Sequence, residues 1–189
     1  MTAGDVLVVA ATKAEAAHVE RTHDVLITGI GKVRAAIAVT RALESGRYRR
    51  VVNIGTAGAL HDHHSGLFVP SRVLEHDISA DRLRGFGYTI TDEWELPGGD
   101  GSVLATGDTF VTDSADRDRI AARADLVDME GAAIAAVCAA FEIPVQLVKV
   151  VSDNADDTAM DWPSAIDSAA VDLARWLDAA GISGRLRPQ

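Results

Sequence analysis

Short runs of β-branched residues alternate with alanine-rich segments along the chain, and this alternation constrains the fold more than any other feature. The runs predict strands at residues 5–11, 24–28, 50–54, 66–74, 102–106, 124–128 and 144–151. The alanine-rich segments predict helices at residues 13–20, 32–45, 114–123, 130–142 and 163–180. Strands that alternate with helices form βαβ units, with parallel strands and with helices on both faces of the sheet. We therefore expect an α/β fold in a single domain over residues 1–189: a three-layer αβα sandwich around a twisted, mostly parallel mixed sheet.

The composition argues against several classes of protein. Of the 189 residues, 48% are hydrophobic, which is typical of a globular chain and not of a disordered one. The formal charge is −10, from 28 acidic against 18 basic residues. Proteins that bind nucleic acid usually carry a basic surface, so we expect no nucleic-acid partner. A small ligand is compatible with this charge, because its site is local.

The sequence does not predict a membrane or secreted protein. No apolar stretch reaches the roughly 20 residues that span a bilayer, and no basic segment precedes the short apolar run near the start. The one cysteine, Cys138, cannot form an internal disulfide. Its place in an apolar helical segment predicts a small buried side chain rather than a nucleophile. We expect a soluble, cytoplasmic protein with no membrane partner.

The segment 76–101 is the least regular part of the sequence. It contains several glycines and four large side chains that look exposed: Phe86, Tyr88, Trp94 and Leu96. A loop of this length in a compact domain is usually functional or belongs to an interface. A mobile surface loop is the alternative interpretation.

Polar residues at the two ends of one helix–strand unit predict a functional site. The apolar strand that ends at Val151 runs directly into Ser152 and Asp153, and Met129 and Glu130 open the helix before it. Ligands of open α/β sheets bind outside the carboxyl ends of the strands, so Asp153 is expected to face a substrate crevice. Considered alone, this cluster of Ser, Asp and Asn is also typical of a helix cap or a turn.

Four motifs follow one another along the chain: ITGIGKVRAAI (27–37), VNIGTAGAL (52–60), TGDTFV (106–111), and DMEGAAIAAVC (128–138) followed by VVSDNADD (150–157). Together they resemble the nucleoside phosphorylase/nucleosidase superfamily, and most closely its methylthioadenosine/S-adenosylhomocysteine nucleosidases. The order of the motifs is specific for the superfamily and much less specific for the substrate. The resemblance implies an enzyme that hydrolyses the N-glycosidic bond of a purine nucleoside, without a metal or other cofactor.

The resemblance also implies the catalytic pair. Asp153 is expected to protonate the departing purine, with Ser152 and Asn154 placed to orient its carboxyl group. Glu15 is expected to activate water from the opposite side of the scissile bond, by analogy with the two separated carboxylates of inverting glycosidases. Alternatively, Glu15 has no catalytic role and is an ordinary glutamate in a surface helix.

The substrate-binding residues follow from the same resemblance. Glu130 is expected to bind the ribose hydroxyls, because a carboxylate accepts hydrogen bonds from two adjacent hydroxyls. The dipole of its helix is expected to favour the ionised form. The base is expected to stack on an aromatic side chain. The full predicted set is Asp128, Met129, Glu130, Phe110, Val111, Ser152, and the small residues of a strand-end loop, Gly55, Thr56 and Ala57. For Val111, core packing is an alternative.

Two further patterns predict partners. The resemblance implies a homodimer in which residues 76–101 of one subunit help to close the site of the other. His61, Asp62, His63 and His64 look like metal ligands. Adjacent residues in a loop seldom converge on one ion, so we predict no metal site.

Departures from the family leave alternatives open. Thr12 stands where methionine is common, Lys149 stands where arginine is common, and the N-terminal half lacks a usual strand pair. An arginine expected before the loop at 55–58 of a phosphorylase is absent, although Arg34 follows another glycine-rich turn. The alternatives are a nucleosidase for another purine ribosyl compound such as futalosine, a phosphorylase, and a non-catalytic nucleoside-binding module.

Overall fold

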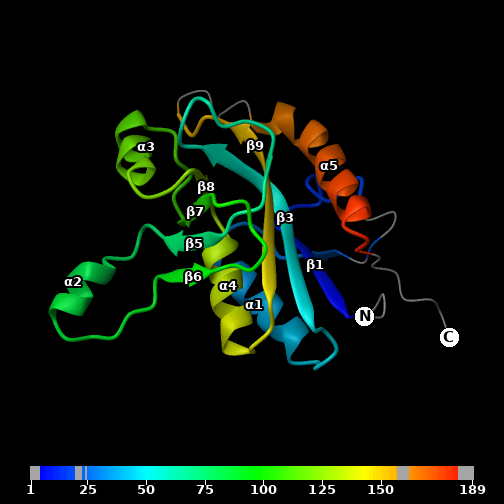
Figure 1. The fold of residues 1–189 in the computed structure, drawn as a ribbon, viewed down its shortest axis with the longest axis horizontal. Coiled ribbons are helices and arrows are strands. Elements are labelled where there is room, and N and C mark those ends of the chain that lie inside the picture. Colours follow the sequence, from blue (N-terminus) through cyan, green and yellow to red (C-terminus); the bar gives the residue numbers. More distant parts are fainter. Residues whose placement is uncertain (1–4, 20–22, 24, 157–161, 183–189) are drawn as a thin grey trace.

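The computed structural model describes residues 5–19, 23, 25–156 and 162–182. Within these residues the chain forms one sheet with helices on both faces (Figure 1). The strands are β1 (Val6–Ala10), β2 (Val25–Ile27), β3 (Arg50–Ala59), β4 (Leu67–Phe68), β5 (Arg72–Glu75), β6 (Glu93–Glu95), β7 (Val103–Thr106), β8 (Leu126–Asp128) and β9 (Val145–Asp153). The helices are α1 (Lys32–Leu43), α2 (Ala80–Gly85), α3 (Ser114–Ala121), α4 (Gly131–Ala140) and α5 (Trp162–Ala179). Over the described residues, no helix combines the length and the apolar character needed to cross a membrane.

The sheet is mixed and mostly parallel, as predicted. Its strand order is β2-β1-β3-β8-β7-β5-β6, and β9 lies between β3 and β4 off this path. The pairs β1–β2, β1–β3, β3–β9, β5–β7 and β7–β8 are parallel. The pairs β3–β8, β4–β9 and β5–β6 are antiparallel.

Side-chain alternation along the central strands produces the three layers. In β1, Leu7 and Val9 belong to the core under α1 and α4, while Val8 and Ala10 belong to the core under α5. Successive side chains of a strand point to opposite faces, so a strand with both faces covered is apolar throughout. Figure 1 shows α5 along one side of β3 and β9, with α1 and α4 on the other side. The predicted αβα sandwich is confirmed.

Strand β3 is twice as long as predicted. Residues Gly55, Thr56 and Ala57 were expected in a loop, but they continue the strand and pair with β9. The pairing register shifts between Ala57 and Gly58, after which β3 pairs with β8. Such a bulge lets a strand bend and change neighbours. The loop prediction is therefore wrong, because long-range pairing keeps this small-residue segment extended.

Two other predicted elements differ from the structure. The helix expected at 13–20 is a series of turns over the described residues, with short-range bonds such as Val19 N to Ala16 O at 2.9 Å. Side-chain bonds between Thr12 and Glu15 compete there with helical bonds. The strand expected at 66–74 is divided into β4 and β5, since Pro70 has no N–H for the ladder.

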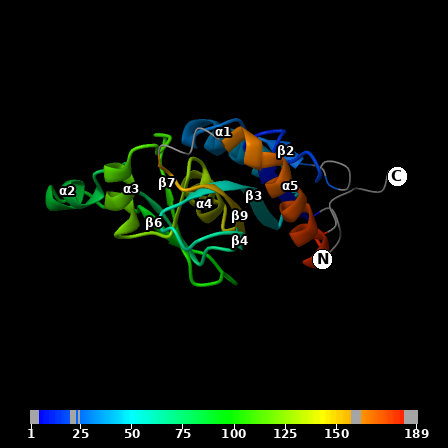
Figure 2. The same ribbon diagram turned by 90° about the horizontal axis from the view of Figure 1, so that it is seen from above.

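The irregular segment 76–101 contains α2 and β6, which were not predicted. Leu96 is buried and Trp94 packs against the core, so the prediction that these two side chains are exposed is wrong. Phe86 and Tyr88 are exposed, as expected. Figures 1 and 2 show α2 standing apart from the sheet, on an arm at one end of the molecule.

Candidate active site

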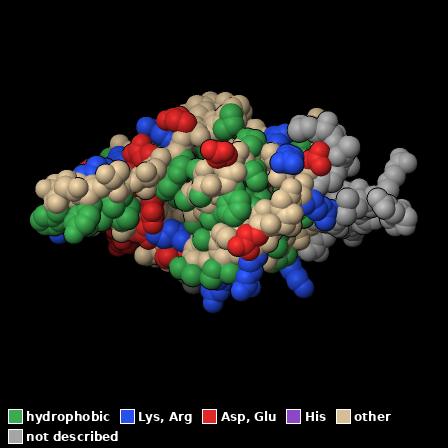
Figure 3. Space-filling view, turned by 90° about the horizontal axis from the view of Figure 1, so that it is seen from below, with side chains coloured by type: hydrophobic (Ala, Val, Ile, Leu, Met, Phe, Trp, Pro, Cys, Tyr) green, Lys and Arg blue, Asp and Glu red, His purple; other side chains and the backbone are tan. Residues whose placement is uncertain are grey.

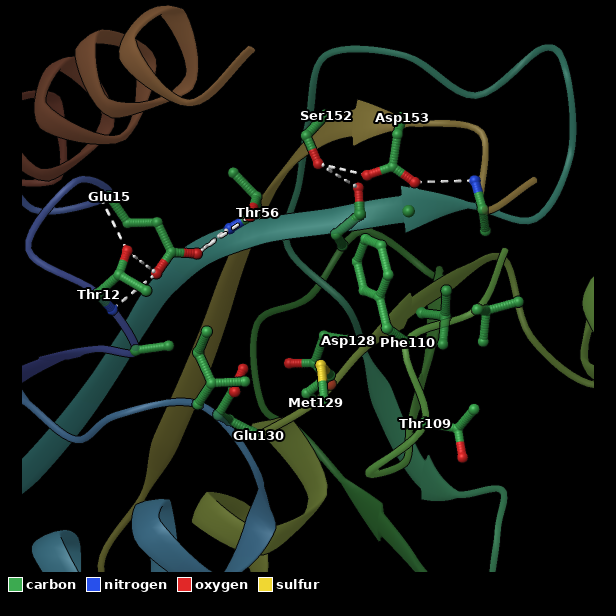
Figure 4. A pocket seen from close by; sticks show the side chains of 17 residues that line it. Thr12, Glu15, Thr56, Thr109, Phe110, Asp128, Met129, Glu130, Ser152 and Asp153 are labelled. Carbon is green, nitrogen blue, oxygen red and sulfur yellow. Dashed lines mark hydrogen bonds between the residues drawn. The ribbon is translucent and has the colours of Figure 1, made fainter. Parts of the chain in front are cut away.

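A cavity of about 350 Å³ lies where β1, β3 and β9 reach their carboxyl ends. Its lining contains every predicted site residue except Gly55: Glu15, Thr56, Ala57, Phe110, Val111, Asp128, Met129, Glu130, Ser152 and Asp153. Seven further residues complete the lining: Ala11, Thr12, Ile30, Gly58, Thr109, Val127 and Ala155. Figure 4 shows these side chains converging from separate segments of the chain.

Glu15 is held on one side of the cavity by four hydrogen bonds. The N–H and the hydroxyl of Thr12 both donate to Oε2, each over 3.0 Å. The N–H and the hydroxyl of Thr56 donate to Oε1, over 2.9 Å and 3.1 Å. The side chain is only 4% exposed, and these donors compensate the cost of burying a carboxylate. Two segments far apart in sequence therefore fix the position of this carboxylate.

Asp153 lies on the opposite side of the cavity, at the end of β9 (Figure 4). The Ser152 hydroxyl donates to its Oδ2 over 2.8 Å, and the Ala155 N–H donates to its Oδ1 over 2.9 Å. Asn154, which was expected to help, is exposed. Within the described part of the chain, Asp153 forms no ion pair, so its carboxyl group is not neutralised by a cation there.

Two glycines make room for the two carboxylates. A Cβ atom at Gly55 would lie 3.0 Å from Glu15 Oε1 and 3.4 Å from Lys149 Nζ, so this glycine supports Glu15 without lining the cavity. A Cβ atom at Gly58 would lie 3.0 Å from Asp153 Oδ1 and 2.9 Å from the Ala155 Cβ. Gly58 was missed as a site residue, because its partner across the sheet is decided by the bulge in β3.

Glu130 lies at the N-cap of α4, and its Oε1 accepts a hydrogen bond from the Gly31 N–H over 2.8 Å. Burial and the nearby Asp128 raise the pKa of Glu130 to about 7, although Lys149 and the Gly31 N–H act in the opposite direction. Here burial outweighs the helix dipole, which was expected to favour the ionised form. Glu130 therefore titrates near neutral pH.

Beneath the cavity, Asp128 and Lys149 form a buried ion pair. Lys149 Nζ lies 2.8 Å from Asp128 Oδ2, and both side chains are at most 2% exposed. The Thr106 hydroxyl and the Gly131 N–H also donate to Asp128, over 2.5 Å and 2.9 Å. Burial opposes the charged form of Lys149, but the carboxylates of Asp128, Glu130 and Glu15 outweigh it and raise its pKa. Asp128 lines the cavity, but its carboxylate is already bonded to these protein partners.

The cavity wall is acidic. Four carboxyl side chains line it, those of Glu15, Asp128, Glu130 and Asp153, and no lysine or arginine appears among the lining residues that the structure describes. Arg34 is outside the lining, and its guanidinium donates to the Ile30 carbonyl over 3.2 Å. Such a wall favours a ligand that becomes positively charged and disfavours an inorganic anion.

Phe110 and Met129 contribute large side chains to the apolar part of the cavity surface. Phe110 is 44% exposed at the cavity, whereas Val111 is buried and also packs in a core cluster. Val111 thus both lines the cavity and packs in the core, and its contact with the base stays a prediction. Thr109 lines the cavity as well and was not singled out from the sequence, although it lies inside the TGDTFV motif.

The histidine cluster lies elsewhere. His63 and His64 pack ring against ring with their centroids 4.3 Å apart, and Asp62 pairs with Arg117 at 2.6 Å. Among the described residues, no group of three or more His, Cys, Asp or Glu side chains is arranged to hold a metal ion. Cys138 is buried, which raises the pKa of its thiol to about 12, so it is not a nucleophile at neutral pH.

The fold and the cavity together define an α/β protein with a partly apolar pocket, lined by carboxyl groups, of a size that suits a small ligand. The family follows from the sequence: a model of the phosphorylase superfamily matches residues 11–92 and 101–180. The chain belongs to this superfamily, which confirms the resemblance.

The relatives narrow the class further. The 5′-methylthioadenosine/S-adenosylhomocysteine nucleosidase of Shewanella denitrificans is 33% identical, over 77% of this chain and 76% of that protein. The nucleosidase of the same name from Helicobacter pylori has a similar structure, with a TM-score of 0.85 at 21% identity over 95% of this chain and 98% of that chain. The futalosine hydrolase of Helicobacter pylori has a TM-score of 0.83 at 21% identity, over 92% of this chain and 95% of that chain. These structural similarities confirm the fold class.

Proposed function

We propose that this protein hydrolyses the N-glycosidic bond of a purine nucleoside, with 5′-methylthioadenosine or S-adenosylhomocysteine as substrate. The observation that carries the proposal is the pair of carboxyl groups, Glu15 and Asp153, on opposite sides of one cavity (Figure 4). Similarity to nucleosidases of that specificity supports the choice of substrate.

In the proposed reaction, Asp153 donates its proton to the purine while the bond between the base and the ribose C1′ breaks. The base thus leaves as a neutral molecule. Water attacks C1′ from the other side, and Glu15 accepts the proton that the water loses. The acidic wall stabilises the positive charge that grows on the ribose. Glu130 binds the ribose hydroxyls, Met129 packs on the sugar, and Phe110 stacks on the base.

Hydrolysis is favoured over phosphorolysis by the charge of the cavity. Phosphate would have to enter beside the carboxyl groups of Glu15 and Glu130, because Asp128 is already paired with Lys149 and Asp153 carries a proton in the proposed reaction. No arginine or lysine lines the cavity in the described residues. Base release from 5′-methylthioadenosine should therefore proceed at the same rate with and without inorganic phosphate. A reaction that requires phosphate and yields a ribose 1-phosphate would refute hydrolysis.

Futalosine is the second candidate substrate, supported by the similarity to a futalosine hydrolase. A panel of 5′-substituted adenosines and futalosine, with the released base quantified, separates the two. Calorimetric binding of these ligands without turnover would instead identify a nucleoside-binding module. A cytoplasmic location stays a prediction.

The raised pKa of Glu130 predicts how activity depends on pH. Below pH 7, protonation removes an acceptor for the ribose hydroxyls, so kcat/KM should fall by up to tenfold per pH unit. The free energy of unfolding depends on pH in the opposite direction. Because the folded state binds this proton more tightly than the unfolded state does, Glu130 stabilises the fold most at low pH, and this stabilisation is lost as the pH rises through 7. A pH series of kcat/KM tests this, with Glu130→Gln expected to be slower and to lack the inflection. An inflection that persists in Glu130→Gln belongs to another group.

A homodimer is part of the proposal. Val33 and Ile37 are four residues apart and share one side of α1, and both are exposed. Ile30, which precedes the helix, is exposed too, as are Phe86 and Tyr88 on the arm with α2. Figure 3 shows hydrophobic side chains on that arm and across the middle of the same face. Because Ile30 also lines the cavity, a partner that covers this surface would close the site. Light scattering tests the assembly, and Val33→Asp should shift a dimer toward monomer.

A further inference from the structure

Thr12 and Glu15 close a reciprocal set of hydrogen bonds in the turn that follows β1. The Glu15 N–H donates to Thr12 Oγ1 over 3.2 Å, while the Thr12 N–H and hydroxyl both donate to Glu15 Oε2 over 3.0 Å. This is a capping-box arrangement, in which a Ser or Thr and a Glu three residues later satisfy each other's N–H groups. The T-x-x-E spacing is thus the sequence signal that could have identified Thr12.

The carboxylate of this capping box is directed into the protein. Glu15 is 4% exposed and lines the cavity, and the residues that follow continue as turns and not as the predicted helix. The Thr12 hydroxyl has two functions at once, because it accepts from the backbone of Glu15 and donates to its carboxylate. Removing that hydroxyl would leave a backbone donor without its acceptor and a buried carboxylate with one donor fewer.

We propose that Thr12 is a positioning residue for hydrolysis: its hydroxyl holds the Glu15 carboxylate in the orientation that accepts the proton of the attacking water. The inference rests on the proposed function, since it assigns Thr12 to the base of that reaction. Thr56 holds the other carboxylate oxygen from β3, so loss of the Thr12 hydroxyl leaves Oε2 held by the Thr12 N–H alone. The consequence is a misaligned base in a site that still binds its ligand.

The test compares Thr12→Val, Thr12→Ala and Thr12→Ser with the unaltered protein, by release of adenine from 5′-methylthioadenosine. Valine keeps the shape of the side chain but has no hydroxyl, whereas serine keeps the hydroxyl. The valine and alanine variants should lose roughly 10- to 100-fold in kcat, the effect of one hydrogen bond to a charged group, with KM close to its original value. Thr12→Ser should restore most of kcat. Lys13→Ala, an exposed change in the same turn, is the control and should be fully active.

Each outcome decides a different point. If the unaltered protein is active and the valine and alanine variants have the same kcat, the role of Thr12 is overturned, while the proposed function stays intact. A rise in KM at constant kcat, or a serine variant as slow as the valine one, would also overturn it, because either shows an effect other than on the base. An unaltered protein without hydrolytic activity would overturn the proposed function together with this inference. If the valine variant melts at a much lower temperature, kcat of the alanine variant is compared with kcat of the serine variant instead.

Discussion

Replacing Asp153 with asparagine is expected to lower kcat for nucleoside hydrolysis by roughly 10²- to 10⁴-fold, with little change in substrate affinity. Asparagine has nearly the same shape and can still accept the Ala155 N–H, so the turn after β9 is preserved. What is lost is the proton that the purine must receive as its bond to the ribose breaks. Initial rates of base release measure kcat, and calorimetry with 5′-methylthioadenosine measures affinity.

Asp113 provides a matched control for this substitution. It caps α3, and its Oδ1 accepts the Ala115 N–H over 2.8 Å, the same contact two residues along the chain that Asp153 makes with Ala155. Asparagine is as good a helix cap as aspartate, so Asp113→Asn should keep both stability and activity. If Asp153→Asn turns over as fast as Asp113→Asn, Asp153 is not the acid and the proposed mechanism is wrong.

Replacing Lys149 with methionine is expected to destabilise the protein by about 3–5 kcal/mol, because it leaves the buried Asp128 carboxylate without its cation. Urea unfolding measures this loss. Adding Asp128→Asn to Lys149→Met should recover part of it, since the neutral amide no longer requires a counter-ion.

The control for Lys149 is an exposed pair. Arg175 lies 3.2 Å from Asp172, with side chains 75% and 45% exposed, so Arg175→Met should change stability by at most about 1 kcal/mol. Both substitutions remove one positive charge and introduce the same side chain. Equal effects of Lys149→Met and Arg175→Met would show that burial of the Lys149–Asp128 pair is not what makes it important.

The parts of the fold that depend on local pattern could be predicted from the sequence. The alternation of apolar runs with alanine-rich segments predicted the layers and the mostly parallel sheet, because both faces of a central strand such as β9 must be apolar. The same pattern failed at residues 13–19, where the bonds between Thr12 and Glu15 hold turns. It also failed at Gly55–Ala57, where pairing with β9 keeps a predicted loop extended.

The candidate site divides in the same way. The motifs identified the predicted site residues, including Asp153 and Glu130. The structure places all of these predicted residues except Gly55 in the wall of one cavity. Gly58 and Thr12 were missed as site residues, and the ion pair of Lys149 could not be foreseen. The contacts of Gly58 and Lys149 have partners that are set by the fold, such as the bulge that places Gly58 opposite Asp153. The spacing of Thr12 and Glu15, in contrast, is a local signal that the sequence already contains.

The amino-acid sequence by itself determined the class of fold, the superfamily and the chemical groups of the site, because periodicity and short motifs are local properties of a chain. The tertiary structure alone decided which of those groups are buried together and which partners they have. Asp128 and Lys149 are 21 residues apart, and their charges matter because the sheet places them 2.8 Å apart and out of water. Electrostatic strength depends on distance and on exclusion of solvent, and both are set only when the chain is folded.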